Sequence, residues 1–224
     1  MLHVSGVSKR FAARTVLSAV SLRVAAGEYV AVVGESGVGK STLLNIIAGL
    51  EAPDSGEVSF MDSNIVSMDD DARTVFRREQ FGFVFQAFHV LPHLTVEQNV
   101  GLPLLLRGFP SHEIQERSKK ALAAVALATR ENSMPRELSG GELQCIAIAR
   151  ALVGSPKLVL ADEPTGNLDP ETSAHVFHEL LELIQHTGVA ALMATHNLAL
   201  ASRMHRVLRL ERGLLIETNP ASVG

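Results

Sequence analysis

The segment Gly34-Glu-Ser-Gly-Val-Gly-Lys-Ser41 constrains the fold more strongly than any other part of this sequence. It matches the pattern G-x-x-x-x-G-K-[ST], in which glycines let backbone N–H groups turn toward a phosphate. The apolar run Tyr29–Val33 before it predicts a strand, and residues 42–49 after it have the apolar spacing of a helix. A strand, a glycine-rich loop and a helix N-terminus with its partial positive charge together predict a phosphate-binding site.

The last residues of this loop have separate expected roles. Lys40 is expected to reach the β- and γ-phosphates of a nucleotide, and Ser41 is expected to ligate Mg²⁺. The predicted contacts of the loop with the nucleotide are Gly34, Glu35, Ser36, Gly37, Val38, Gly39, Lys40, Ser41 and Thr42.

Composition places the chain among ordinary globular proteins. It has 224 residues, of which 46% are apolar, enough for one large domain with a substantial core. Its formal net charge of -4 predicts no general attraction to nucleic acid or to anionic lipid. The single cysteine, Cys145, excludes an internal disulfide and suits a reducing compartment. We find no export signal in residues 1–6 and no run of about 18 apolar residues that would span a membrane.

Strands and helices are predicted along the whole chain. Apolar runs with β-branched residues predict strands, and apolar residues at helical spacing predict helices. The predicted strands are 2–7, 16–24, 29–33, 57–60, 81–85, 157–161, 189–195, 206–210 and 214–218. The predicted helices are 42–49, 69–78, 111–129, 143–153, one from Asp169 to about His186, and one opened by a capping box at Thr95 and Gln98.

Polar residues follow several of the predicted strands directly. Asp162 and Glu163 come after an apolar run, Gln86 follows the strand 81–85, and His196 follows the strand 189–195. In α/β folds the chemistry lies at the carboxyl ends of such strands. We therefore expect Asp162 to hold Mg²⁺ and Glu163 to face the attacking water.

The segment Leu138–Glu142 has two interpretations. Ser139 and Glu142 have the spacing of a capping box, which needs no ligand. Alternatively, the adjacent Gly140 and Gly141 expose backbone N–H groups to an anion at a helix N-terminus.

Two further features are open from the residues alone. Phe11, among basic residues, either stacks on a purine or covers a strand edge. Residues 87–135 show no strand pattern and predict a helical insertion, with Pro103 expected to break or kink its first helix. The apolar residues in 87–106 serve either core packing or docking on another protein.

These segments together resemble the nucleotide-binding domain of ABC transporters, over essentially the whole chain. The matching motifs occur in the family's order: the loop 34–41, Gln86, Leu138–Glu142, the strand and acids 158–163, Asp169 and His196. The resemblance implies an α/β fold of the P-loop NTPase type, with a largely parallel core sheet and an antiparallel β-subdomain. It also implies a single domain over residues 1–224, in which 1–86 and 154–224 form the core and β-subdomain and about 87–153 form a helical subdomain.

The resemblance also implies roles for individual residues. Phe11 would stack on adenine, Ser41, Gln86 and Asp162 would hold Mg²⁺, and Glu163, His196 and Gln86 would be the catalytic residues. In a homodimer that forms on ATP binding, the residues contacting the ATP of the other copy would be Ser139, Gly140, Gly141, Glu142 and Asp169.

The sequence is most similar to stand-alone ATPases that serve lipoprotein release (LolD type), macrolide export (MacB type) and cell division (FtsE type). The similarity lies in Phe81–Gln86, Leu91-Pro92, Asn99-Val100 and Leu160–Asp169, and the segment Ala199–Met204 favours the lipoprotein-release type. It implies ATP hydrolysis that energises a separate membrane permease docking near residues 87–106. The chain would then lie on the inner face of the cytoplasmic membrane, bound through its partner and not to nucleic acid. A regulatory ATPase of the division type and a macrolide or peptide efflux ATPase are the alternatives.

Three residues depart from the family's pattern. Cys145 stands where a basic residue is usual, Leu143 is atypical, and Asn197 follows His196 where an acid is common. They are expected to affect the rate or the coupling of hydrolysis rather than its presence.

Overall fold

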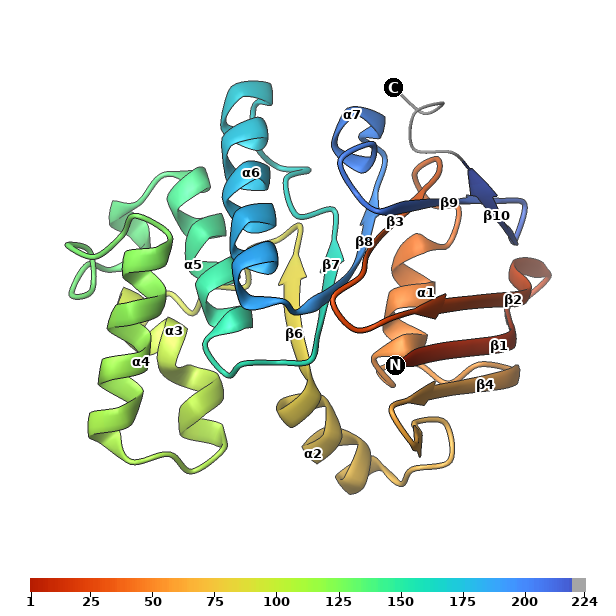
Figure 1. Ribbon diagram of the computed structural model, residues 1–224, viewed down its shortest axis with the longest axis horizontal. Coiled ribbons are helices and arrows are strands. Elements are labelled where there is room, and N and C mark those ends of the chain that lie inside the picture. The colour runs from red at the N-terminus through yellow and green to blue at the C-terminus, as the bar shows by residue number, and fades with distance from the viewer. Residues whose placement is uncertain (219–224) are drawn as a thin grey trace. The chain divides into compact units, whose positions relative to one another are not determined.

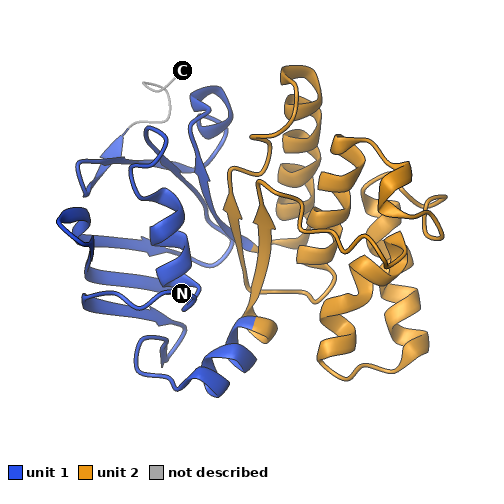
Figure 2. Ribbon diagram, turned by 180° about the vertical axis from the view of Figure 1, so that it is seen from behind, with its two compact units in different colours: residues 1–77, 190–224 blue, residues 78–189 orange. Residues whose placement is uncertain are grey.

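The computed structural model describes residues 1–218. Two compact units make up the chain, one of residues 1–77 and 190–224 and the other of residues 78–189 (Figure 2). We describe each unit by itself.

The first unit contains an antiparallel sheet with the strand order β2-β1-β4-β5. Its strands are β1 (Leu2–Phe11), β2 (Arg14–Val24), β4 (Ser55–Phe60) and β5 (Ser63–Asn64). Along β2, buried and exposed residues alternate toward its end, as expected for a sheet with one solvated face. The predicted antiparallel β-subdomain near the N-terminus is therefore confirmed (Figure 1).

The same unit also contains mainly parallel strands. β3 (Tyr29–Val33) lies between β8 (Ala190–Thr195) and β9 (Arg206–Glu211) and is parallel to both, while β10 (Leu214–Thr218) is antiparallel to β9. Every residue of β3 and β8 is buried, which explains why these runs are apolar without alternation. The helices are α1 (Lys40–Ile47) and α7 (Leu198–Ala201). The helix α2 (Asp70–Gln80) begins in this unit and ends in the other.

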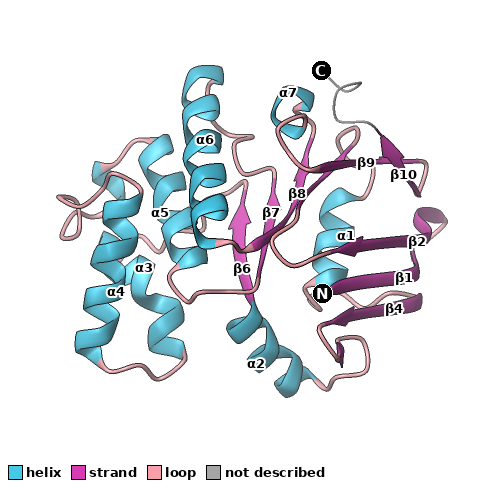
Figure 3. Cartoon of the chain, in the orientation of Figure 1, coloured by secondary structure: helices cyan, strands magenta, loops and turns pink. Residues whose placement is uncertain are grey.

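The second unit is mainly helical around one parallel strand pair (Figure 3). The strands are β6 (Phe81–Phe85) and β7 (Leu158–Asp162), and the helices are α3 (Val96–Leu106), α4 (Ser111–Ala124), η1 (Pro135–Glu137), α5 (Gly140–Leu152) and α6 (Pro170–Thr187). The helix α5 packs against β6 and against α3, α4 and α6. Residues 87–153 contain no strand, and their definition as a subdomain remains a prediction.

One helix prediction was wrong, and a second was wrong in part. The helix predicted over 111–129 ends at Ala124, because Ala126 takes a left-handed conformation (φ 58°) and the Leu127 N–H bonds back to the Leu122 carbonyl. This turn buries Leu127, which is 6% exposed. Pro103 does not break α3, which runs to Leu106, and a kink at Pro103 stays a prediction. The proline removes one backbone donor, while the Thr95 cap and the buried face of the helix are retained.

No helix of residues 1–218 is long and apolar enough to cross a membrane.

Asn99 organises the irregular segment before α3. Its side chain is fully buried, and its Oδ1 accepts a hydrogen bond from the Leu91 N–H at 2.7 Å. Its Nδ2 lies 3.0 to 3.1 Å from the carbonyl oxygens of Leu91, Leu94 and Thr95. One amide thus replaces the regular backbone partners that this loop lacks.

We expect Asn99→Ala to lower the free energy of unfolding by about 1–3 kcal/mol, because it leaves buried backbone groups without partners. Chemical denaturation would measure the loss. The matched control is Asn132→Ala, since Asn132 is exposed and such surface changes stay within about 0.5 kcal/mol. Equal stability of the two variants would contradict the role of Asn99.

Candidate functional site

The predicted phosphate loop lies between β3 and α1. Gly39 caps α1 in a conformation with φ 118°, and a Cβ at this position would lie 2.5 Å from Val16 Cγ1, so only glycine fits. Lys40 is 6% exposed, and its Nζ donates to the carbonyls of Gly34 and Glu35 at 2.9 and 3.1 Å. The ammonium group is thereby held inside the loop.

Arg14 supports this loop from the neighbouring strand β2. Its Nη2 donates to the Gly37 carbonyl at 2.8 Å. Sequence reasoning missed this contact, because Arg14 belongs to no motif of the phosphate loop.

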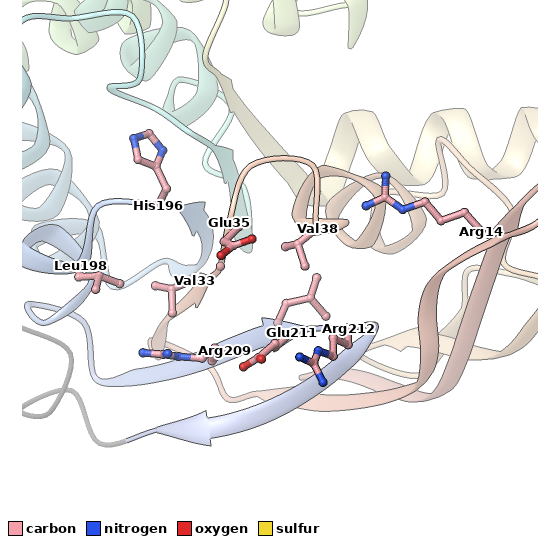
Figure 4. A pocket seen from close by; sticks show the side chains of 11 residues that line it. Arg14, Val33, Glu35, Val38, His196, Leu198, Arg209, Glu211 and Arg212 are labelled. Atoms are coloured by element: carbon pink, nitrogen blue, oxygen red, sulfur yellow. The ribbon is translucent and has the colours of Figure 1, made fainter.

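A cavity of about 720 Å³ brings part of the loop together with His196. Gly34, Glu35, Val38 and His196 are among the residues that line it. The other lining residues are Arg14, Val33, Leu198, Arg209, Leu210, Glu211 and Arg212 (Figure 4). Pairing of Val33 with Thr195 places Gly34 and His196 just beyond adjacent strand ends, so the predicted convergence at this sheet edge holds within the first unit.

Phe11 lies at the end of β1 with 47% of its surface exposed. The Lys9 ammonium is 5.3 Å from the centre of its ring, while Lys9 also bonds to the Ala52 carbonyl and to Glu51. A half-exposed aromatic side chain is compatible with stacking on a base, and stacking on adenine remains a prediction.

The second unit holds the predicted carboxylates and Gln86. β6 and β7 are parallel, and Phe85 pairs with Asp162. Gln86 and Glu163 therefore follow adjacent positions at one sheet edge. Glu163 has φ 46°, a left-handed conformation that is uncommon for a residue other than glycine. Such backbone outliers are concentrated at active sites.

Asn167 was missed by sequence reasoning, although it lies between Glu163 and Asp169. Gln86 Nε2 donates to Asn167 Oδ1 at 2.9 Å, and Asn167 Nδ2 donates to the Gln86 carbonyl at 2.9 Å. This reciprocal pair joins Gln86 to the segment that follows the carboxylates.

The predicted capping box at the start of α5 is confirmed. Ser139 Oγ accepts from the Glu142 N–H at 3.3 Å, and Glu142 Oε2 accepts from the Ser139 N–H at 2.8 Å. The hydrogen bonds that Glu142 Oε2 accepts from the Ser139 N–H and from Ser139 Oγ hold the pKa of Glu142 below its ordinary value. A contact of Ser139, Gly140, Gly141 and Glu142 with a nucleotide remains a prediction.

Asp169 caps α6, and Pro170 lies in the first turn of that helix. The Oδ1 atom of Asp169 accepts a hydrogen bond from the Thr172 N–H at 3.1 Å. Hydrogen bonds from Thr172 lower the pKa of Asp169, so the carboxylate is charged at neutral pH.

The helix α5 connects its capped N-terminus to the segment after β6. Near its start, Gln144 Nε2 donates to the Phe85 carbonyl at 3.4 Å. At its other end, Arg150 donates to the carbonyls of His89 and Phe88 at 2.7 and 2.9 Å. The helix α5 is thus hydrogen-bonded to both ends of the segment 85–89, which contains Gln86.

Comparison with known proteins decides the family. The family model described as "ABC transporter" matches residues 17–166. The chain belongs to the ABC transporter family. The fold predicted from the motifs is thereby confirmed, and with the complete motif set the chain is an ATP-binding and ATP-hydrolysing subunit of this family.

Individual ABC proteins are similar over nearly their whole length. The lipoprotein-releasing system ATP-binding protein LolD of Paramagnetospirillum magneticum is 48% identical over 90% of this chain and 89% of its own. LolD of Ruegeria sp. is 47% identical over 96% of this chain and 97% of its own.

Solved structures agree with this assignment. The dimeric structure of MJ0796, a bacterial ABC transporter cassette, has a TM-score of 0.89 at 36% identity, and covers 98% of this chain and 99% of its own. A dimeric post-hydrolysis state of MJ0796, bound to ADP and Pi, has a TM-score of 0.88 at 35% identity, with the same coverage of both chains.

The residues that the ABC resemblance assigns to Mg²⁺ have suitable chemistry. Ser41 offers a hydroxyl, Asp162 a carboxylate and Gln86 an amide oxygen, and Mg²⁺ prefers such oxygen ligands. Within residues 1–218, no group of three or more His, Cys, Asp or Glu residues could hold a metal ion.

Cys145 departs from the ABC pattern without adding reactivity. The thiol lies on α5 and is 7% exposed. Burial, followed by the charges of Glu179 and Glu142, raises the pKa of Cys145 to about 11. The basic residue usual in the family is thus replaced by a small buried group.

We expect Cys145 to react with a maleimide at pH 8 about 100-fold more slowly in the native protein than in the unfolded protein. Its pKa of about 11 leaves little thiolate, whereas a free cysteine has a pKa near ~8.5. Mass spectrometry gives an unambiguous readout because the chain has one cysteine. Equal rates in the two states would show that the thiol is not buried.

Proposed function

We propose that this chain is the ATPase subunit of a lipoprotein-releasing ABC transporter. The similarity to LolD proteins at 46 to 48% identity, over most of both chains, carries this proposal. The chain then works as a homodimer, since the similar MJ0796 cassettes are dimeric.

The phosphate loop binds the triphosphate of ATP. Backbone N–H groups of residues 34–42 and the ammonium of Lys40 neutralise the phosphate charge, while Phe11 stacks on the adenine. Lys40 exchanges its bonds to the Gly34 and Glu35 carbonyls for bonds to phosphate, so it needs no large movement.

Hydrolysis needs an oriented water and a proton acceptor. Glu163 takes a proton from the attacking water, while Gln86 orients that water and His196 contacts the γ-phosphate. Ser41, Asp162 and Gln86 would hold Mg²⁺, which would supply positive charge against the charge that develops on the phosphates.

A second copy of the chain completes the charge clamp. The N-terminus of α5, with Ser139, Gly140, Gly141 and Glu142, approaches the ATP of the other copy, and Asp169 lies nearby. The capping box supports this role because it keeps the helix start ordered before any nucleotide arrives. Hydrolysis removes the γ-phosphate bridge, and the dimer opens.

The membrane permease docks on the segment 87–106. Core packing and docking, the two interpretations of the apolar residues in this segment, apply to different side chains. Val96, Val100 and Leu104 are buried in the core, whereas Leu91, Leu105 and Leu106 are 43%, 61% and 59% exposed. Exposed apolar side chains on an anchored segment suit a protein partner. Through that partner the chain lies on the inner face of the cytoplasmic membrane.

We expect Glu163→Gln to retain ATP binding and to lower turnover by about 100-fold or more, because the water loses its proton acceptor. Phosphate release and equilibrium binding of a fluorescent ATP analogue would separate the two effects. In contrast, Lys40→Ala should weaken the binding itself. Unchanged turnover of Glu163→Gln would exclude Glu163 as the base.

A tagged Glu163→Gln protein, with Mg-ATP and mild detergent, should co-purify a polytopic membrane protein. Leu105→Asp combined with Leu106→Asp should abolish this association. The control is Leu214→Asp on β10, which changes a leucine of similar exposure, 52%, outside the segment. Recovery of only a soluble dimer from the parent protein would contradict the docking proposal and leave the ATPase intact.

A further inference from the structure

The Gln86–Asn167 pair fixes the orientation of both side-chain amides. A backbone carbonyl can only accept a hydrogen bond, so the Gln86 carbonyl requires the Nδ2 end of Asn167. Asn167 Oδ1 must then face the Gln86 side chain, and it accepts from Gln86 Nε2 at 2.9 Å. The chain's own backbone therefore determines which end of the Gln86 amide faces Asn167.

Gly166 closes the other side of this arrangement. A Cβ at Gly166 would lie 3.0 Å from Gln86 Nε2, 3.2 Å from its Cδ and 3.3 Å from its Cγ. A side chain at 166 would therefore force the Gln86 side chain to shift by a few tenths of an ångström. Gly166 and Asn167 together restrict both the position and the rotation of the amide.

The side-chain oxygen of Gln86, Oε1, takes no part in this pair. Of the Gln86 side chain the pair uses only Nε2, and it leaves Oε1 for another ligand. Mg²⁺ prefers oxygen ligands, and an amide nitrogen in its place would offer only N–H donors. An amide turned by 180° would present the wrong atom, so its orientation matters for metal binding.

We propose that Gly166 and Asn167 form a seat that holds the Gln86 amide with Oε1 directed to a metal ion, which makes Asn167 a positioning residue. The inference rests on the Mg²⁺ site proposed above and deepens it. The seat also lies between Glu163 and Asp169, so it connects the orientation of Gln86 to the segment that carries the proposed base.

The test measures metal-dependent nucleotide binding, with hydrolysis stopped by Glu163→Gln. Affinity for a fluorescent ATP analogue is measured in EDTA and in MgCl₂, and the ratio of the two dissociation constants gives the contribution of the metal. In Asn167→Ala this contribution should fall by about tenfold, as for other groups that orient metal ligands, while affinity in EDTA stays constant.

A double-mutant cycle separates positioning from a general effect. Gln86→Ala should lower the metal contribution, and adding Asn167→Ala should lower it no further, because Asn167 acts only through Gln86. Gly166→Ala should also lower the contribution of the metal to nucleotide affinity, as Asn167→Ala does. The control is Glu171→Gln, an exposed position in the first turn of α6, which should behave like the parent protein.

The outcomes distinguish the two proposals. Additive effects of Gln86→Ala and Asn167→Ala, or an Asn167→Ala variant with the parent's metal contribution, would overturn the seat and leave the Mg²⁺ site standing. A Gln86→Ala variant with an unchanged metal contribution would overturn both.

Discussion

Parallel pairing between neighbouring strands is the constraint on which this protein depends. In the first unit, Val33 of β3 pairs with Thr195 of β8 and with Arg209 of β9. The residues that follow these strands, among them Gly34 and His196, therefore emerge at one edge. In the second unit, Phe85 pairs with Asp162. Gln86 and Glu163, which follow these two residues, therefore also emerge at one edge. A shift of one residue in either register would displace these residues relative to one another.

The polar groups of the proposed site are held by hydrogen bonds within the chain itself. Lys40 is bound by carbonyls of its own loop, Ser139 and Glu142 hold each other, and Gln86 pairs with Asn167. Phosphoryl transfer depends on position and charge more than on covalent chemistry. Groups already fixed by hydrogen bonds lose less entropy on binding, which favours catalysis by positioning.

Two side chains give the irregular segment 87–95 a defined shape without regular structure. Asn99 binds backbone atoms of Leu91, Leu94 and Thr95, and Arg150 binds the carbonyls of Phe88 and His89. Because Arg150 belongs to the helix that begins with Gly140, a movement of this helix would be transmitted to the exposed segment. The same helix thus serves both the proposed nucleotide contact and the proposed docking surface.

Much of this protein follows from local sequence. The phosphate loop, the strands that precede each polar motif and both predicted capping boxes have signals within a few residues, because glycine conformations, β-branched runs and cap hydrogen bonds are local effects. The end of α4 at Ala124 was not predictable in this way, since a left-handed turn at Ala126 is stabilised by burial of Leu127. Continuation of α3 through Pro103 likewise depends on a buried helix face.

The sequence by itself determined the fold class, the family and the identity of the motif residues, because these depend on residue types at fixed spacing. Only the tertiary structure decided which residues support the motifs. Arg14 reaches Gly37, Asn167 reaches Gln86 and Arg150 reaches Phe88 across 23, 81 and 62 residues of chain. Contacts over such distances arise from strand pairing and helix packing, and they leave no periodic pattern in the sequence.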